Sequence, residues 1–386
     1  MTQSGLETEP SGIASPFRTD RWLNITLVLL LFAIVAGIGL FAYTIYRDRQ
    51  TEDQSTATGR IAAALGAQVR TNPNDVIARV RYAEALGAMA KYQQAIDQLN
   101  AALKIDPKHT GAYLDLGMIA QLTQNNSAAE SYFLKVISLT DASQYSGVDP
   151  SREQAFFNLG TLVLGEKRYG DAAGYFKAAL RIRGDASDTY YSLAKAYQGL
   201  GDADAAIQQL ETALQFDPGF AEAHFFLGQL YAQKKDDVNA SYQFAQAAKN
   251  APTADPPKQA LDAYGSASDW ISKAKTALGE GEIETALNDI LVARNLDAKS
   301  LDAAKLHGQI LVQRGDLKDA LDVYRQAAAL NPKDTDVRRQ IAVLTAQVAA
   351  LTPAKAAAVK KAATKKVAAA KKATASKSAS ATATGK

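Results

Sequence analysis

The stretch SDTYYSLAKAYQGLGDADAAIQQLETALQFDP, residues 187–218, contains one complete copy of a pattern that fills most of the chain. Apolar residues recur within it at intervals of three and four, which is typical of helices that bury one face. Gly201 in its middle favours a sharp turn between two such helices. Pro218 ends the second helix, because proline cannot continue a helix. The stretch therefore predicts a helix-turn-helix unit.

The pattern recurs with a period near 34 residues. Pro73 and Pro107 are 34 residues apart, and so are Pro218 and Pro252. The motifs YLDLG, FFNLG, YYSLA and HFFLG share one internal spacing and begin at Tyr113, Phe156, Tyr190 and His224. Each motif is followed at fixed spacing by an alanine (Ala129, Ala172, Ala206, Ala240), a bulky residue (Phe133, Phe176, Leu210, Phe244) and a smaller one (Val136, Ala179, Ala213, Ala247).

This pattern resembles the tetratricopeptide repeat, a pair of antiparallel helices about 34 residues long. The resemblance implies an all-α fold, a right-handed α-solenoid of about seven helix-turn-helix units in which each unit contacts mainly its neighbours. The expected repeat starts are Val76, Thr110, Glu153, Ser187, Ala221, Ala267 and Leu301. Insertions of nine and twelve residues, near ASQYSGVDP and TADPPKQALDAY, follow the second and fifth repeats.

An uncharged apolar stretch of 25 residues, WLNITLVLLLFAIVAGIGLFAYTIY, precedes the array. About 20 helical residues cross a bilayer, and aromatic rings at the ends suit its interfaces. We therefore expect an uncleaved, single-pass anchor in the cell membrane, with flanking arginines too evenly divided to orient it. The expected segments are a disordered 1–21, a transmembrane helix 22–46, a linker 47–57, the repeat solenoid with a C-terminal capping helix 58–351, and a disordered Lys/Ala-rich tail 352–386.

The composition argues against catalysis. The chain has no cysteine, which excludes disulfides, thiolate metal sites and cysteine nucleophiles. Its three histidines, His109, His224 and His307, fall in separate repeats without acids at metal-ligand spacing. The anchor, the repeats and the tail account for nearly all of the chain, so we expect no enzyme activity, no cofactor and no metal site.

The resemblance also implies a binding surface. In the family, the first helices of the repeats line a concave surface that faces a bound protein or peptide segment. One position on these helices is aromatic in three consecutive repeats, at Phe157, Tyr191 and Phe225. Such rings either anchor apolar side chains of a partner or pack against adjacent first helices, and the sequence leaves both open. The predicted groove comprises Leu114, Phe157, Tyr191, Phe225, Ile271, Lys195, Gln229 and Lys275.

The C-terminal tail is basic, whereas the rest of the chain is acidic. The tail carries nine of the 43 basic residues and no acid, which leaves 34 basic against 40 acidic residues elsewhere. It resembles the lysine- and alanine-rich tails of linker histones, which implies a polyanion partner: nucleic acid, anionic lipid or a wall polymer. A solvated tail without a ligand stays open as well. The candidate polyanion-binding residues are Lys360, Lys361, Lys365, Lys366, Lys371 and Lys372.

Together these features predict a membrane-anchored scaffold or adaptor that binds a protein or peptide partner on its concave face and assists assembly of a membrane or envelope complex. The alternative is a membrane-linked nucleic-acid tether that acts through its lysine-rich tail. Deletion of residues 353–386 separates the two, because only the scaffold keeps its function without the tail.

Overall fold

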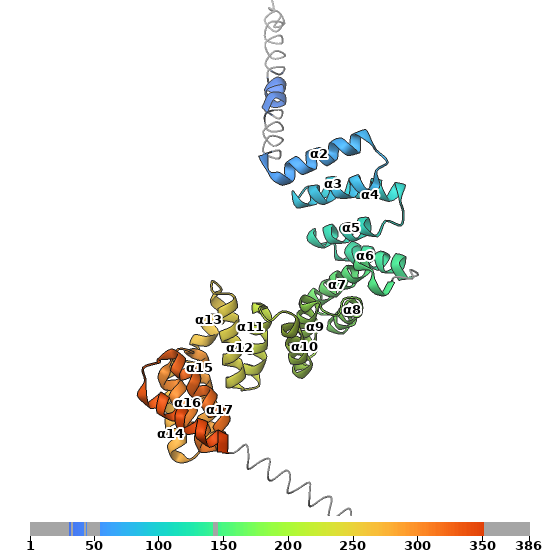
Figure 1. The fold of residues 1–386 in the computed structure, drawn as a ribbon. Helices are drawn as coiled ribbons and strands as arrows, with labels where there is room; N and C mark the ends of the chain where they lie inside the picture. Colours follow the sequence, from blue (N-terminus) through green and yellow to red (C-terminus); the bar gives the residue numbers. More distant parts are fainter. Residues whose placement is uncertain (1–30, 32–33, 42–43, 45–54, 142–145, 351–386) are drawn as a thin grey trace, which may run out of the picture. The chain divides into compact units, whose positions relative to one another are not determined.

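The computed structural model describes residues 31, 34–41, 44, 55–141 and 146–350 (Figure 1). Within these residues, all regular secondary structure is helical. The chain divides into two compact units, Met1–Leu162 and Val163–Lys386. The expected all-helical repeat architecture is therefore confirmed for the described part of the chain.

The first unit contains α2 (Ala57–Thr71), α3 (Val76–Ala88), α4 (Tyr92–Ile105), α5 (Thr110–Leu122), α6 (Asn126–Asp141), the short 3-10 helix η1 (Ser146–Val148) and α7 (Pro150–Gly165), which reaches the boundary. Helices α3 and α4 pack as one pair and α5 and α6 as the next. Helix α2 packs on α3.

The second unit contains α8 (Tyr169–Ile182), α9 (Ser187–Gly199), α10 (Ala203–Phe216), α11 (Ala221–Gln233), α12 (Asp237–Asn250), α13 (Asp255–Asp262), α14 (Ala267–Glu280), α15 (Ile283–Leu296), α16 (Leu301–Arg314) and α17 (Leu317–Leu330). Residues 335–350 are also helical. Asp334 caps this last helix by accepting from the Val337 amide at 2.9 Å, and Lys305 holds Asp334 at 3.1 Å.

The repeat starts agree with the periodicity of the sequence. Six of the seven expected starts are the first residue of a helix, and the seventh, Glu153, lies in the first turn of α7. Polar side chains satisfy amide groups that a helix start leaves without an intrahelical partner. Asp75, Asp202 and Asp236 each accept from the backbone amide three residues later.

A glycine on the first helix lets the two helices of a repeat approach closely. A methyl group on Gly228 of α11 would lie only 2.7 Å from the Phe244 ring of α12. Gly117 and Gly308 face Phe133 and Tyr324 in the same way. The leucine-glycine signature therefore marks the place where the bulky residue of the second helix inserts.

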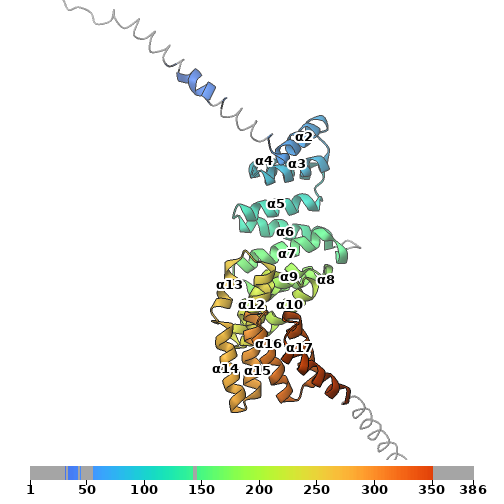
Figure 2. The ribbon, with the colours of Figure 1, turned by 60° about the vertical axis from the view of Figure 1, so that its left-hand side comes forward.

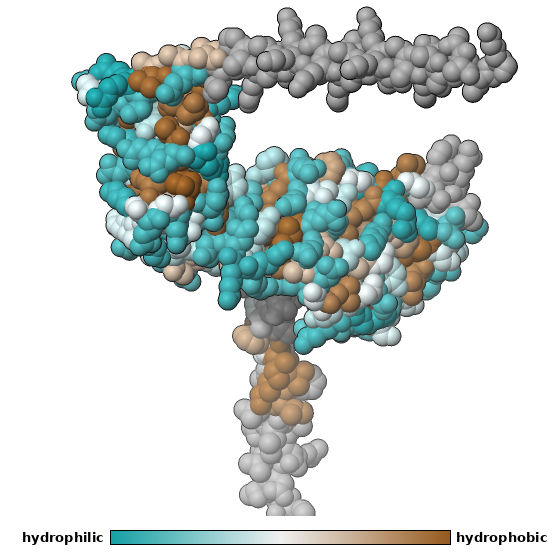
Figure 3. All heavy atoms as spheres, turned by 90° about the horizontal axis from the view of Figure 1, so that it is seen from below, coloured by the Kyte–Doolittle hydropathy of each residue, from teal (hydrophilic) through white to brown (hydrophobic). Residues whose placement is uncertain are grey.

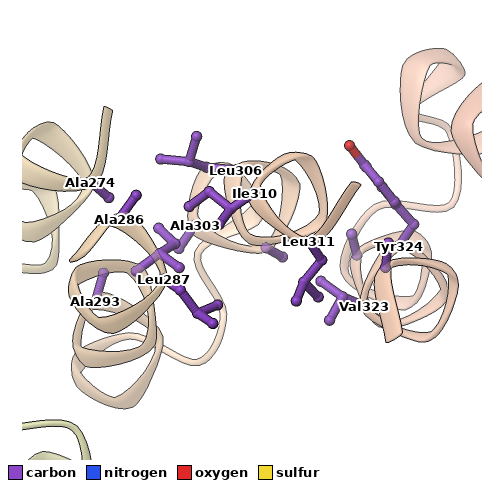
Figure 4. Packing of buried hydrophobic residues seen from close by; sticks show 14 of the residues in the cluster. Ala274, Ala286, Leu287, Ala293, Ala303, Leu306, Ile310, Leu311, Val323 and Tyr324 are labelled. Atoms are coloured by element: carbon purple, nitrogen blue, oxygen red, sulfur yellow. The ribbon is translucent and has the colours of Figure 1, made fainter. Parts of the chain in front are cut away.

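The core is a series of layers between neighbouring helices. In the last repeats, Leu287 of α15 points toward Ala303 and Ile310 of α16, and Leu311 of α16 points toward Val323 of α17 (Figure 4). Ile310 and Ala303 are fully buried there. Burial of each large aliphatic side chain is worth roughly 1.5–3 kcal/mol, so these layers supply most of the driving force for stacking.

The twelve-residue insertion forms α13 and alters the packing that follows. The second helix of one repeat packs on the first helix of the next where α4 meets α5, α8 meets α9, α10 meets α11 and α15 meets α16. Helix α12 instead packs on α13 and on α15 (Figures 1 and 2). Asn295 of α15 fixes this contact by donating to the Val238 carbonyl and to Ser241 Oγ, both at 3.0 Å.

Candidate functional site

A pocket of about 380 Å³ opens in the second unit between α9, α11 and the start of α13. We call it the α9–α11–α13 pocket. It brings together four residues of the predicted groove, which are Tyr191 and Lys195 from α9 and Phe225 and Gln229 from α11. The other lining residues are Gln198, Ala221, Glu222, Phe226, Ala251, Ala254, Pro256 and Pro257. Its size falls in the range of pockets that bind small ligands or anchor side chains.

Tyr191 is both a packing residue and a wall of the pocket. Its ring centre lies 5.2 Å from that of Phe220 and 5.9 Å from that of Phe226, which it meets edge-on. Burial, together with the nearby Glu222 carboxylate, raises the pKa of Tyr191. The phenol is therefore neutral at physiological pH and offers an apolar face with a polar tip.

Phe225 combines the same two roles on α11. Its ring centre lies 5.6 Å from that of Phe244 on the second helix of the repeat. Phe225 remains only partly buried and lines the pocket. The rings of Tyr191 and Phe225 thus each pack against other residues of the protein and also present a face to the pocket. The two alternatives left open by the sequence are compatible for Tyr191, which packs on Phe226 of the next first helix, whereas Phe225 packs on the second helix of its own repeat.

The insertion supplies the wall that sequence reasoning did not assign. Ala251 and Ala254 lie in the turn before α13, and Pro256 and Pro257 lie in its first turn. Proline is favoured there because its fixed φ suits the start of a helix, where an amide would lack an intrahelical partner. The two consecutive prolines were the sequence signal for a helix start within the insertion. The insertion has no equivalent in the other repeats, so the sequence did not show which helices it contacts.

Two opposite charges border the pocket. Lys195 Nζ lies 5.6 Å from the centre of the Tyr191 ring, within the range of a cation–π contact. Glu222 lies in the first turn of α11. Gln198 and Gln229 add neutral polar groups. The site can therefore hold an apolar group deep in the pocket and polar or charged groups at its rim.

The remaining residues of the predicted groove do not line this pocket. Ile271 of α14 is only 9% exposed and belongs to the apolar core, whereas Lys275 on the same helix is exposed. The insertion is the physical reason, because α12 packs on α13 and on α15 rather than on α14, the next first helix. Leu114 is buried and Phe157 half-buried in the first unit. The tail lysines lie outside the described residues.

The first unit has a smaller polar feature on its first helices. Asp115 Oδ2 on α5 and Asn158 Nδ2 on α7 are buried, and neither atom has a hydrogen-bond partner among the described residues. Burial, with a smaller contribution from Glu84, raises the pKa of Asp115 to about 7. An acceptor and a donor left unsatisfied in this way are suited to hydrogen bonds with a ligand.

The two buried histidines have structural partners. His224 lies 2.6 Å from Gln243 Oε1 through Nδ1 and 3.1 Å from the Pro218 carbonyl through Nε2. His307 Nδ1 lies 2.8 Å from the Arg294 guanidinium. Burial, and then Arg294 and Arg314, lower the pKa of His307 to about 4. His307 is therefore neutral at physiological pH and accepts a hydrogen bond from Arg294.

The predicted anchor lies mostly outside the described residues. Its described residues, 31, 34–41 and 44, are helical, and Ile34, Val35, Ile38, Leu40 and Phe41 are each more than half exposed. Figure 3 shows these residues as a hydrophobic segment bordered by grey atoms. Among the described residues, none of the helices has the length and apolar character that a membrane crossing requires.

Comparison with known families identifies the repeats. Models of the tetratricopeptide repeat match residues 80–146, 163–219 and 301–344. The matches fall in both units and cover helices of the array. The chain thus contains tetratricopeptide repeats, as the resemblance implied.

Several known proteins are similar to this chain at low identity. The tetratricopeptide repeat and J domain-containing co-chaperone DNJ1 of Cryptococcus neoformans var. grubii is 24% identical over 221 residues, which cover 52% of this chain and 42% of that protein. DnaJ protein P58IPK homolog B of Oryza sativa subsp. japonica is 22% identical over 314 residues, covering 69% and 66%. The chain thus spans less than half of the first relative and about two thirds of the second. The crystal structure of YrrB, described as a TPR protein with an unusual peptide-binding site, is similar with a TM-score of 0.42 and 21% identity, covering 52% of this chain and 98% of that one.

Proposed function

Starting from an array of tetratricopeptide repeats, we propose that this protein is a scaffold that captures a segment of a partner protein in the α9–α11–α13 pocket. The observation that carries the proposal is the pocket itself, with a volume of about 380 Å³ and walls of aromatic, alanine and proline side chains. Aromatic anchors surrounded by polar groups are typical of the residues that dominate protein–protein binding energies. The role is one of binding, and we assign no catalysis to it.

The pocket is suited to capture because its walls are already packed. Tyr191 is held by Phe220 and Phe226, and Phe225 is held by Phe244. A partner side chain that enters does not have to order these rings. Side-chain ordering costs about 0.5–1.5 kcal/mol per immobilised group, so a preformed wall retains more of the binding energy.

The scaffold is proposed to act at the cell membrane through residues 22–46. The support is the uncharged composition of this segment and the exposed apolar side chains of residues 34–41. Apolar side chains exposed in such number are unfavourable in water. A 25-residue uncharged segment is long enough to cross a bilayer, so lipid can surround these side chains. In this position the scaffold would assist assembly of a membrane or envelope complex. The relative with co-chaperone in its name is compatible with a role in assembly.

The lysine-rich tail is proposed to add affinity for a polyanion. Its support is the run of nine lysines without an acid, which attracts phosphate-rich surfaces in a salt-dependent manner. This contribution is separate from partner capture. A chain that lacks residues 353–386 is therefore expected to bind its protein partner as before.

The proposal is tested by co-purification from the native host with the full-length chain. The double variant Tyr191→Ser, Phe225→Ser is expected to lose the co-purifying partner, because it removes both aromatic walls. Tyr242→Ser is the matched control, since Tyr242 is 46% exposed on α12 and does not line the pocket. Retention of the partner by a folded double variant, judged by its circular dichroism spectrum, would refute the proposal.

A further inference from the structure

We propose that the α9–α11–α13 pocket selects a partner segment with one bulky apolar side chain beside an acidic residue, and that the inserted helix α13 creates this selectivity. The inference rests on the proposed function, because it names the chemistry of the segment that the scaffold captures. It depends on three features of the pocket: its volume, its apolar inserted wall and the position of its charges.

The volume limits what can enter. A cavity of about 380 Å³ has room for one or two large side chains, but the apolar face of a whole helix does not fit in it. The closing wall is made by Ala251, Ala254, Pro256 and Pro257. Prolines have no backbone amide and therefore present no donor that would need water. The deep part of the pocket is thus suited to an aliphatic or aromatic side chain.

The charges make the rim favourable to an acid. Lys195 is exposed, one helical turn beyond Tyr191, and its ammonium lies over that ring at 5.6 Å. Glu222 is the opposing charge, but it lies in the first turn of α11. The partial positive charge of a helix N-terminus offsets a carboxylate there. Glu222 is thus partly compensated within its own helix, whereas Lys195 lies in the middle of α9 away from either helix end, so Lys195 is the charge at the rim that is better able to attract a carboxylate of the partner.

The apolar pocket and the charge of Lys195 lie close enough to contact neighbouring residues of one partner segment. Lys195 and Tyr191 are neighbours on the same helix face, so an acid that meets Lys195 belongs to a residue near the one whose side chain fills the pocket. Phe225 and Gln229 provide the corresponding pair on α11, and Gln229 is exposed. The amide of Gln229 can donate to the same carboxylate or to the backbone of the segment.

The experiment selects ligands for the full-length chain, purified in a mild detergent, from a phage-displayed library of random peptides. Enriched peptides are expected to share a bulky apolar residue within a few positions of Asp or Glu. One selected peptide is then synthesised, and its affinity is measured by fluorescence polarisation. Lys195→Glu is expected to weaken binding at least about tenfold. A peptide with Lys in place of its acid is expected to regain affinity for that variant.

Two further variants complete the test. Lys318→Glu, an exposed charge reversal on α17 outside the pocket, is expected to leave peptide affinity unchanged. Ala254→Phe adds a ring to the inserted wall and is expected to abolish binding by filling the pocket. The inference is overturned if no peptide is enriched, if the enriched peptides lack an acid, or if they bind Ala254→Phe as tightly as the unchanged chain.

The outcome also separates this inference from the proposed function. Co-purification of the native partner that is lost in the Tyr191→Ser, Phe225→Ser variant but kept in Lys195→Glu would leave the scaffold role standing and refute the acidic preference. Loss in neither variant would refute both.

Discussion

The ammonium nitrogen of Lys195 lies 5.6 Å from the centre of the Tyr191 ring, four residues earlier on α9. The same ring meets Phe226 of α11 edge-on at 5.9 Å. Tyr191 therefore links the packing between two repeats to a charged position at the rim of the pocket.

The first prediction concerns the close contact between the helices of the fifth repeat. Gly228→Ala would place a methyl group 2.7 Å from the Phe244 ring. We expect the free energy of unfolding to fall by about 1–3 kcal/mol, as for other cases of core overpacking. Gly174→Ala on α8 is the control, because nothing lies within 4 Å of its added methyl group. Urea unfolding of both variants gives the comparison, and equal midpoints would contradict the packing described for α11 and α12.

A second prediction concerns a turn without glycine. Gln124, between α5 and α6, has a φ of 60°, in the left-handed region that disfavours side chains. Gln124→Gly is expected to raise the free energy of unfolding by up to about 1 kcal/mol, because glycine adopts this φ without strain. Gln121→Gly in the last turn of α5 should instead lower it by a similar amount. Thermal unfolding followed by circular dichroism measures both, and destabilisation by Gln124→Gly would show that this turn is not strained.

A third prediction concerns pH. The pKa of His307 is lowered to about 4 by burial and by Arg294 and Arg314, whereas an unfolded histidine titrates near 6.5. The unfolded state therefore binds the proton first. The stabilisation from the neutral side chain is complete above about pH 6.5 and decreases as the pH falls toward 4, by about 3 kcal/mol in total.

Trp270 packs against the apolar core formed by α14 to α17, and His307 lies on α16, one of those helices, so Trp270 reports on this part of the chain. Urea unfolding followed by tryptophan fluorescence at pH 7 and pH 4.5 should show a larger loss of stability in the unchanged chain than in His307→Leu. Other groups titrate equally in both chains, so their effect cancels in the difference. The same pH dependence in both chains would mean that His307 is not held neutral by its surroundings.

A fourth prediction concerns the membrane. The full-length chain is expected to stay in the membrane pellet after an alkaline carbonate wash, because carbonate removes peripheral proteins but not an apolar segment inside the bilayer. Deletion of residues 1–46 should release the chain into the supernatant. The chain that lacks residues 353–386 is the control and should remain in the pellet. Release of the full-length chain by carbonate would contradict the anchor.

The sequence predicted the regular part of the fold well, because that part is encoded by recurring residue types. Gly201, Gly281 and Gly315 have φ values between 81° and 91°, as turns between helices require. Four other turns adopt the same region with non-glycine residues, namely Ala90, Gln124, Lys167 and Lys235. No glycine signals these turns in the sequence. Packing of the two flanking helices imposes the conformation there.

The sequence predicted only those residues of the candidate site that occupy equivalent positions in consecutive repeats. Tyr191, Lys195, Phe225 and Gln229 occupy equivalent positions in consecutive first helices, and the structure brings them together in the pocket. The wall formed by Pro256 and Pro257 could not be placed, since an insertion has no equivalent in neighbouring repeats. The inclusion of Ile271 in the groove assumed an uninterrupted row of first helices. The contact between α12 and α15 shows that the row is interrupted before α14.

The central claim is that the α9–α11–α13 pocket contacts a partner protein. The most direct measurement is site-specific photo-crosslinking in the native host, with p-benzoylphenylalanine in place of Gln229, an exposed residue of the pocket. Gln208, exposed on α10 and outside the pocket, is the matched control position. We predict a discrete adduct from position 229 that is absent from position 208 and is lost when Tyr191→Ser and Phe225→Ser are added. Equal adducts from both positions, or none from position 229, would contradict the account.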